Sequence, residues 1–183
     1  MQNKLSETKY YLPAEDTVFF ANHIQNEKGK YALDIGTGSG YLAKVLLSNF
    51  EAVIATDISY DATKKAHSVI ENCICCNSAD ALSAEFDLVI CNMPYLPSDK
   101  IIDNAVDGLQ EGLVIPLQII QSSKNLIRKG GKMIFLTSSL ANYKELLKQT
   151  ELLGFQVTIL ATKKMFFEEL RSEERRVGKE CRL

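Results

Sequence analysis

The strongest structural signal in the chain is Leu33-Asp34-Ile35-Gly36-Thr37-Gly38-Ser39-Gly40-Tyr41. An apolar strand runs here into a glycine-rich turn, and the turn opens a helix. Gly36, Gly38 and Gly40 lack a Cβ atom, which permits positive φ angles and lets the backbone pass close to a ligand. The stretch therefore predicts a strand, turn and helix with a ligand at the turn.

The spacing of these glycines separates two classes of ligand. A dinucleotide fingerprint reads G-x-G-x-x-G, whereas here the third glycine comes one position early and Tyr41 stands in its place. The Asp34 carboxylate would also repel a pyrophosphate, whereas it suits a ligand that bears an ammonium and a sulfonium group. S-adenosylmethionine is such a ligand. A merely tight strand-to-helix turn is the alternative.

The rest of the chain alternates short apolar runs with segments of helical period, separated by Gly, Asn or Asp. This alternation predicts a parallel sheet with crossover helices, which is a doubly wound α/β fold. The expected strands are 31–35, 52–56, 72–76, 86–91, 132–137, 155–161 and one that starts near residue 166. The expected helices are 14–23, 41–48, 61–70, 116–128 and 142–153.

Length and composition limit the functional classes. A chain of 183 residues with 46% hydrophobic content fits one domain with one core. No run approaches the roughly 18 to 20 apolar residues that span a bilayer, and the N-terminus is too polar for a secretory signal, so a cytoplasmic enzyme is expected. The cysteines suggest reduced thiols and no metal site, because three of them crowd into one expected strand without loop spacing.

The C-terminal sequence differs from the rest of the chain, because it becomes charged and aperiodic after Leu170. Residues 171–183 resemble the translation of a sequencing-adapter oligonucleotide, so we expect a native domain over 1–170 and a non-native tail over 171–183. A genuine solvated tail is the alternative. We expect strand pairing to stop near Leu170, because residues 172–176 would place charges at core-facing positions.

The net charge argues against an unaided binder of nucleic acid. The tail holds five Lys or Arg and three Asp or Glu, so the remaining chain has 16 basic and 20 acidic residues and a net charge near −4. A protein that binds phosphates through charge alone needs the opposite balance.

Acidic residues occur at the ends of three successive expected strands. Asp34 precedes the glycines, and Asp57-Ile58 ends the second strand, where a carboxylate can accept both ribose hydroxyls. An ordinary helix N-cap is the alternative for Asp57. After the third strand, Asp80 can accept an adenine amino group and Ala81 offers a backbone N–H. All three acids are expected at the one edge of the sheet where open α/β folds bind ligands.

The fourth expected strand ends in Asn92-Met93-Pro94-Tyr95. These residues resemble the (D/N)-P-P-(Y/F) motif of nitrogen methyltransferases that modify planar amides and amines. The resemblance implies that Asn92 Oδ1 and the Met93 carbonyl accept the two N–H groups of the target, that Pro94 rigidifies the turn, and that Tyr95 covers the flat group. Met93 replaces the usual proline, but its carbonyl stays available. Two fixed acceptors would hold a weakly nucleophilic nitrogen in line with the methyl group.

Two further segments resemble one family. Tyr11-Leu12-Pro13-Ala14-Glu15-Asp16-Thr17 is similar to the Y-x-P-A-E-D-(S/T) stretch of short HemK-type methyltransferases, and Ala105-Val106-Asp107-Gly108-Leu109-Gln110-Glu111-Gly112 stands where that family has A-x-(D/G)-G-x-x-G. In the family the first segment helps close the cofactor pocket, which implies that role for Glu15 and Thr17. A simple helix cap at Asp16 or Thr17 is the alternative. The chain is identified as a member of the HemK-type N5-glutamine methyltransferases of the archaeal and eukaryotic kind, which lack an N-terminal recognition domain.

This resemblance implies a seven-stranded class I fold that binds S-adenosylmethionine, with a last antiparallel strand, here truncated, between the fifth and sixth. It implies a substrate, the glutamine of the Gly-Gly-Gln loop in class-1 release factors, and a partner, a small zinc-binding activator. The edge strand Cys73–Cys76 has no charge or proline, so a partner strand is expected to cover it, although a short edge can also be safe alone.

Three other functions stay open at this point. An adenine-N6 methyltransferase would grip an exocyclic amine with the same turn after base flipping. A lysine methyltransferase would hold an amine in an aromatic-lined pocket. A catalytically silent cofactor-binding subunit would explain Met93 and the altered C-terminus.

Overall fold

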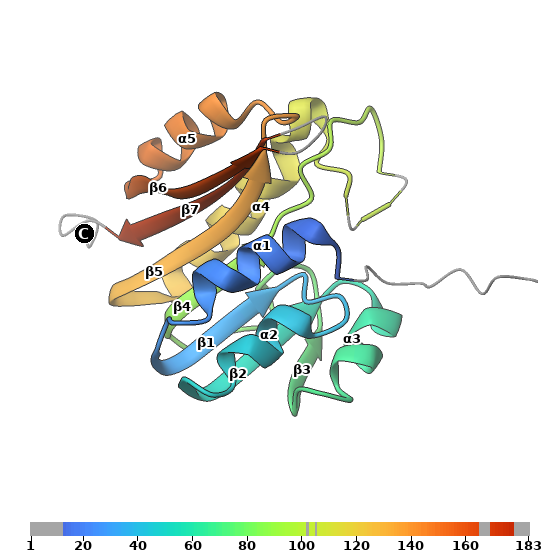
Figure 1. The fold of residues 1–183 in the computed structure, drawn as a ribbon, viewed down its shortest axis with the longest axis vertical. Helices are drawn as coiled ribbons and strands as arrows, with labels where there is room; N and C mark the ends of the chain where they lie inside the picture. The colour runs from blue at the N-terminus through green and yellow to red at the C-terminus, as the bar shows by residue number, and fades with distance from the viewer. Residues whose placement is uncertain (1–12, 102, 105, 165–168, 178–183) are drawn as a thin grey trace, which may run out of the picture.

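The computed structural model describes residues 13–101, 103–104, 106–164 and 169–177. Its seven strands form one sheet in the order β3-β2-β1-β4-β5-β7-β6, and β7 runs opposite to the other six (Figure 1). The strands are β1 (Gly29–Ile35), β2 (Phe50–Asp57), β3 (Asn72–Cys75), β4 (Phe86–Asn92), β5 (Ile127–Ser138), β6 (Phe155–Lys164) and β7 (Glu169–Val177). The doubly wound fold and the antiparallel last strand between the fifth and sixth are confirmed.

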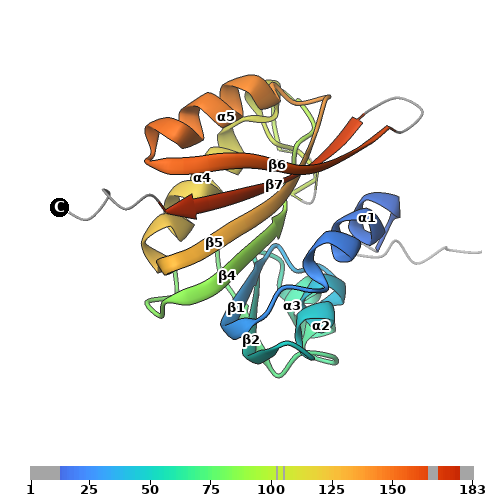
Figure 2. The ribbon, with the colours of Figure 1, turned by 60° about the vertical axis from the view of Figure 1, so that its left-hand side comes forward.

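Helices cover both faces of this sheet. They are α1 (Glu15–Ile24), α2 (Tyr41–Leu46), α3 (Tyr60–Ala66), α4 (Val114–Ser123) and α5 (Tyr143–Leu152), with short 3-10 turns at Gln110–Gly112 and Lys124–Leu126. Side chains of α1 and α2 pack in one core cluster, and those of α4 and α5 pack in a second on the opposite face (Figure 2). No helix of the described residues is long and apolar enough to cross a membrane.

The position of β4 at the centre of the sheet explains its apolar sequence. All but the last residue of β4 are buried, because β4 lies between β1 and β5 and has helices on both faces. A strand buried on both faces reads as a continuous apolar run rather than as an alternation. The chain order reverses between β1 and β4, and this is the place where the connecting loops diverge and leave a crevice.

The fifth strand is longer than expected, and the helix before it is shorter. α4 ends at Ser123, and β5 begins at Ile127 rather than at residue 132. Gly130, at a φ of +83°, and Gly131, whose absent Cβ would lie 2.8 Å from the Phe86 carbonyl oxygen, carry the strand past a register shift against β4. The expected helix end at residue 128 is therefore wrong, and the two glycines belong to a bulge inside β5.

The expected end of strand pairing near Leu170 is wrong. β7 continues to Val177 and pairs with β5 on one side and β6 on the other. This places Glu173 at 0% exposure and Glu174 at 9%. Backbone N–H and C=O groups pair whatever the side chain is, and the Glu174 carboxylate is compensated by Lys132 Nζ at 2.8 Å. Residues 178–183 lie outside the described residues, and the non-native origin of 171–183 stays a prediction.

Candidate active site

A cavity of about 830 Å³ opens at the carboxyl ends of β1, β2 and β4. It lies where the strand order reverses, which is the usual ligand site of open α/β sheets, and its volume suits a small molecule. Seven of the residues expected at the site from sequence line it. They are Thr17, Gly36, Gly38, Asp57, Ile58, Asn92 and Pro94.

The turn after β1 forms one wall of the cavity. The N–H groups of Gly36 and Thr37 donate to the Thr56 carbonyl oxygen at 2.9 and 3.0 Å, so the turn is fastened to β2. Gly36 has a φ of +69°, and a Cβ built on it would meet no atom within 4 Å. The open space beside this glycine lies along the cavity wall, as required for a backbone that approaches a ligand closely.

Asp34 lies beneath the turn and does not line the cavity. Its Oδ2 accepts from Thr37 Oγ1 at 2.7 Å and from the Ala43 N–H at 3.1 Å. Burial raises the pKa of Asp34 to about 7, the two hydrogen bonds oppose this, and Asp57 adds to it. Asp34 Oδ1 is buried and accepts no hydrogen bond from any described residue. This carboxyl therefore holds the turn from below and keeps one free acceptor.

Asp57 lines the cavity next to the turn. Its Oδ2 accepts from the Gly38 N–H at 2.9 Å and its Oδ1 from the Ser59 N–H at 2.8 Å. Burial raises the pKa of Asp57, and the two backbone hydrogen bonds lower it. The carboxylate fixes the glycine turn and also starts the segment that leads into α3.

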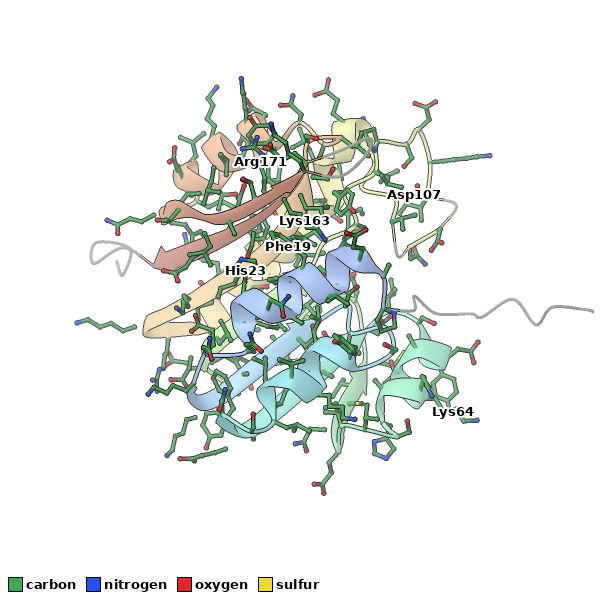
Figure 3. All side chains as sticks on the ribbon, viewed as in Figure 1. Phe19, His23, Lys64, Asp107, Lys163 and Arg171 are labelled. Atoms are coloured by element: carbon green, nitrogen blue, oxygen red, sulfur yellow. The ribbon has the colours of Figure 1, made fainter. Side chains whose placement is uncertain are left out.

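The other expected cofactor residues lie away from the wall. Glu15 is exposed and forms an ion pair at 2.5 Å with Lys163, which Figure 3 labels on β6. The absent Cβ of Gly40 would lie 2.8 Å from a Val69 methyl group, so this glycine serves helix packing. Asp80 and Ala81 are exposed. Asn77, which sequence reasoning did not select, lines the cavity instead.

A hydrogen bond connects Asn77 with the acid that follows it. Asn77 Nδ2 donates to Asp80 Oδ2 at 3.2 Å. Ser78, with a φ of +48°, also lines the cavity, and its carbonyl oxygen accepts from Thr56 Oγ1 at 2.8 Å. The tight turn after β3 thus turns Asn77 and Ser78 toward the cavity. The Asn-Ser pair two residues after β3 is a sequence signal that would have indicated this turn.

The Asn92–Tyr95 turn forms the opposite wall. Asn92 Nδ2 donates to Asp16 Oδ2 at 3.0 Å, while the Oδ1 atom is buried and accepts no hydrogen bond from a described residue. Pro94 lines the cavity. Met93 is 2% exposed and packs in the core, and Tyr95 packs against the other core cluster and does not line the cavity.

The segment 108–112 supports this turn from behind. A Cβ on Gly108 would lie 2.6 Å from the Pro94 carbonyl oxygen, and one on Gly112 would overlap the Tyr95 carbonyl oxygen. The N–H of Gly108 donates to the Leu96 carbonyl oxygen at 2.8 Å. The glycines of this segment are therefore needed for close contact between two backbones.

Further lining residues come from the chain between β4 and α4 and from α4. Asp107 lies on this loop in Figure 3. Sequence reasoning included Asp107 in the segment 105–112 but gave none of these side chains a role in the site. They are Ile101, Asp103, Asn104, Asp107, Ile115, Gln118 and Ile119.

Comparisons with known proteins agree with this geometry. The methyltransferase small domain family matches residues 15–167. A protein of Methanocaldococcus jannaschii, provisionally named protein N5-glutamine methyltransferase, is 31% identical over 173 residues, which cover 87% of this chain and 88% of that protein. A release factor glutamine methyltransferase of Chlorobaculum tepidum is 31% identical over 140 residues, 63% of this chain and 48% of that protein, so the chain spans about half the length of this relative.

A solved structure supports the fold assignment. The structure of the E. cuniculi Mtq2-Trm112 complex, described as responsible for methylation of the eRF1 translation termination factor, has a TM-score of 0.80 and 23% identity. The match covers 93% of this chain and 99% of the other. The two chains thus share a fold, and the family model and the M. jannaschii relative identify the family within it. The chain belongs to the methyltransferase small domain family and, within it, to the HemK-type methyltransferases that its motifs resemble.

Proposed function

We propose that the chain transfers a methyl group from S-adenosylmethionine to the side-chain amide nitrogen of a protein glutamine, in the Gly-Gly-Gln loop of a class-1 release factor. The cofactor supplies an electrophilic methyl group. The glycine turn with Asp57 and Ile58 is the proposed cofactor wall, and Asn92 with Pro94 is the proposed target wall. The names of the M. jannaschii and C. tepidum relatives support glutamine as the target.

One observation carries the proposal. Asn92 Oδ1 is a buried acceptor on the cavity wall that accepts no hydrogen bond from the described residues. An acceptor without a donor inside a protein costs about 1 to 3 kcal/mol, so such an atom points to a donor brought by a ligand. A primary amide brings two N–H groups. The Met93 carbonyl is the second acceptor in this proposal.

The residues then act by orientation rather than by proton abstraction. An amide nitrogen is a weak nucleophile because its lone pair is delocalised over the carbonyl group. Two fixed acceptors hold it in line with the methyl group and stabilise the positive charge that develops on nitrogen. Asp34 supports the opposite wall from below, where its Oδ2 holds the glycine turn through Thr37 Oγ1 and the Ala43 N–H.

The proposal is tested with labelled cofactor and three substrates. A release factor, an adenine-containing oligonucleotide and a histone are each incubated with the purified chain, alone and with its co-expressed activator. We expect label in the release factor alone, and none when its Gly-Gly-Gln glutamine is replaced by alanine. Label in the oligonucleotide or on a histone lysine would instead favour one of the two rival enzymes. Cofactor binding without any transfer would indicate a silent subunit.

We also propose that a small zinc-binding activator docks on β3. Among the strands that the structure describes, β3 pairs with β2 alone and forms one end of the sheet. Asn72 and Cys75 are exposed, and nearby Ile58 and Tyr60 are 54% and 69% exposed. An edge with unused backbone groups and apolar neighbours suits strand addition by another chain. The Mtq2 protein was solved in complex with Trm112, which supports this partner class.

Cys75→Lys tests the docking, because Cys75 is the exposed apolar residue of the strand. We expect loss of co-purification with the activator and an unchanged melting temperature of the isolated chain. Ser83→Lys, at an exposed position in the loop after β3, adds the same single charge and is the matched control. Co-purification of the Cys75 variant at wild-type stoichiometry would remove β3 as the docking edge.

A further inference from the structure

The two ends of the Asn92 side-chain amide have different surroundings. Nδ2 donates to Asp16 Oδ2 at 3.0 Å, and Oδ1 is buried at the cavity wall and accepts no hydrogen bond within the described part of the chain. An amide can turn by 180° about its last torsion and exchange these two atoms with little change in shape. Some feature of the protein must therefore select the orientation.

Asp16 has the chemistry to make this selection. It lies in the first turn of α1, is 7% exposed, and is separated from Asn92 by 76 residues of sequence. The positive end of a helix favours a negative charge in its first turn. A carboxylate accepts hydrogen bonds and cannot donate them, so it faces Nδ2 of an asparagine and rejects Oδ1.

The second oxygen of Asp16 fixes the carboxyl group itself. Oδ1 accepts from the Thr17 N–H at 2.6 Å and from Thr17 Oγ1 at 3.2 Å. The Thr17 N–H is a backbone donor of fixed direction, so the atom that faces it must be an acceptor. The carboxyl group is thereby held with its other oxygen toward Asn92.

We propose that Asp16 is a positioning residue that holds the Asn92 amide with Oδ1 toward the target nitrogen. This inference rests on the proposed function, in which the target presents N–H donors to Asn92. With the amide reversed, Nδ2 would meet those N–H groups, and two donors cannot form a hydrogen bond. The reversed enzyme would keep its fold and its cofactor site but lose the oriented acceptor.

Asp16→Asn reverses the amide without changing its shape. The Thr17 N–H requires the oxygen of the introduced amide, so the introduced NH₂ group must face Asn92. Asn92 then turns its own Oδ1 to that donor and its Nδ2 to the cavity. The hydrogen bond between position 16 and Asn92 is kept, while the first turn of α1 loses a negative charge, so we expect a small fall in melting temperature and the wild-type cofactor Kd.

The expected kinetic result is a loss of kcat of about 100-fold in Asp16→Asn, the size seen when one preorganised contact is removed. The double variant Asp16→Asn, Asn92→Asp should recover at least about tenfold of this loss, because the NH₂ group introduced at position 16 would donate to one oxygen of the new carboxylate and leave the other for the target. Asn92→Asp in the wild-type background places two carboxylates side by side, so we expect its kcat to stay low. Glu145→Gln, a carboxylate-to-amide change in the first turn of α5 and away from the cavity wall, is the matched control.

A measurement without substrate separates this inference from the proposed function. In wild type, NMR cross-peaks of the Asn92 side-chain NH₂ should connect to Asp16 and Thr17 of α1, and in Asp16→Asn they should disappear. If the chain methylates a glutamine and Asp16→Asn keeps wild-type kcat and these cross-peaks, the positioning role is wrong. If wild type methylates a different group, the proposed function fails, while the NMR result still decides the role of Asp16.

Discussion

Two glycine-containing segments of this chain, residues 36–40 and 108–112, have different surroundings. Beside Gly36 the space for a Cβ is open and borders the cavity, whereas the space beside Gly112 is filled by the backbone of Tyr95. Both residues have a positive φ, +69° and +72°. A glycine with a positive φ can therefore make room for a ligand or for another segment of the same protein, and the backbone angle alone does not distinguish the two cases.

The two segments support different walls of the site. The first segment shapes the wall proposed to hold the cofactor, and the second supports the Asn92–Tyr95 turn proposed to hold the target. We expect substitutions in the first segment to weaken cofactor affinity. We expect substitutions in the second segment to lower stability and turnover. The following variants test that division.

Gly112→Ala should have the largest effect. The new Cβ would overlap the Tyr95 carbonyl oxygen and would also occupy a left-handed φ. We expect a loss of stability of about 3 kcal/mol or more, which corresponds to a fall in melting temperature on the order of 10 °C for a domain of this size. Gly36→Ala, which adds only the φ strain of about 1 to 2 kcal/mol, is the paired control. Equal melting temperatures for the two variants, measured by calorimetry, would abolish the distinction between the segments.

Asn92→Ala should act on turnover alone. Removal of one preorganised acceptor is expected to raise the barrier of methyl transfer by roughly 2 to 4 kcal/mol. Cofactor affinity should stay within a few fold, because the variant leaves the glycine turn intact. Single-turnover rates and isothermal titration with the cofactor measure the two quantities. Wild-type turnover in this variant would remove Asn92 from the proposed target wall.

Asp57→Ala should act on the cofactor alone. It removes the acceptor of the Gly38 N–H and a carboxylate from the cavity wall. Hydrogen bonds to charged groups contribute about 1.5 to 3 kcal/mol, so the cofactor Kd should rise by roughly ten- to hundredfold. An undiminished affinity in calorimetry would leave Asp57 with only a structural role at the start of α3.

The pH dependence of stability tests Asp34, which supports the first segment from below. Burial raises its pKa from 3.8 to about 7, so between these values the folded state keeps a proton that the unfolded state has released. Stability then falls as pH rises through this window, by about 1 kcal/mol per pH unit, and levels off above pH 7. Asp34→Asn should lack this decline. Urea titrations of the two proteins at several pH values below and above about pH 7 measure the decline. The same pH dependence of stability in both proteins would contradict the raised pKa of Asp34.

The glycine turn and the turn after β4 could be predicted from the sequence, because each depends on residues that are close together in the chain. A strand followed by three glycines and a helix predicted the turn at Gly36, and Asn92-x-Pro-Tyr predicted a special turn after β4. The placements that failed depend on distant groups. Asp80 follows its strand as expected, yet the turn at Ser78 directs Asn77 to the cavity and leaves Asp80 exposed.

The C-terminal strand shows the same limit. Its charges predicted a solvated segment, whereas β7 lies between β5 and β6 with Glu173 buried. Each of these strands offers a row of backbone groups to β7, and pairing on two sides outweighed the local preference of the side chains. The charge pattern indicated a segment unsuited to a core, but the neighbours that β7 would gain could not be counted from the sequence.

The amino-acid sequence alone determines the alternation of strands and helices, the positions of the glycine turns and the identity of the polar groups at the strand ends. These follow from backbone sterics and from periodic burial, which act over a few residues. The pairing of Asp16 with Asn92, the contact of Gly112 with Tyr95 and the burial of β7 arise from the order of strands in the sheet. That order brings together residues far apart in the chain, and hydrogen bonds and packing between such residues exist only once the sheet has formed.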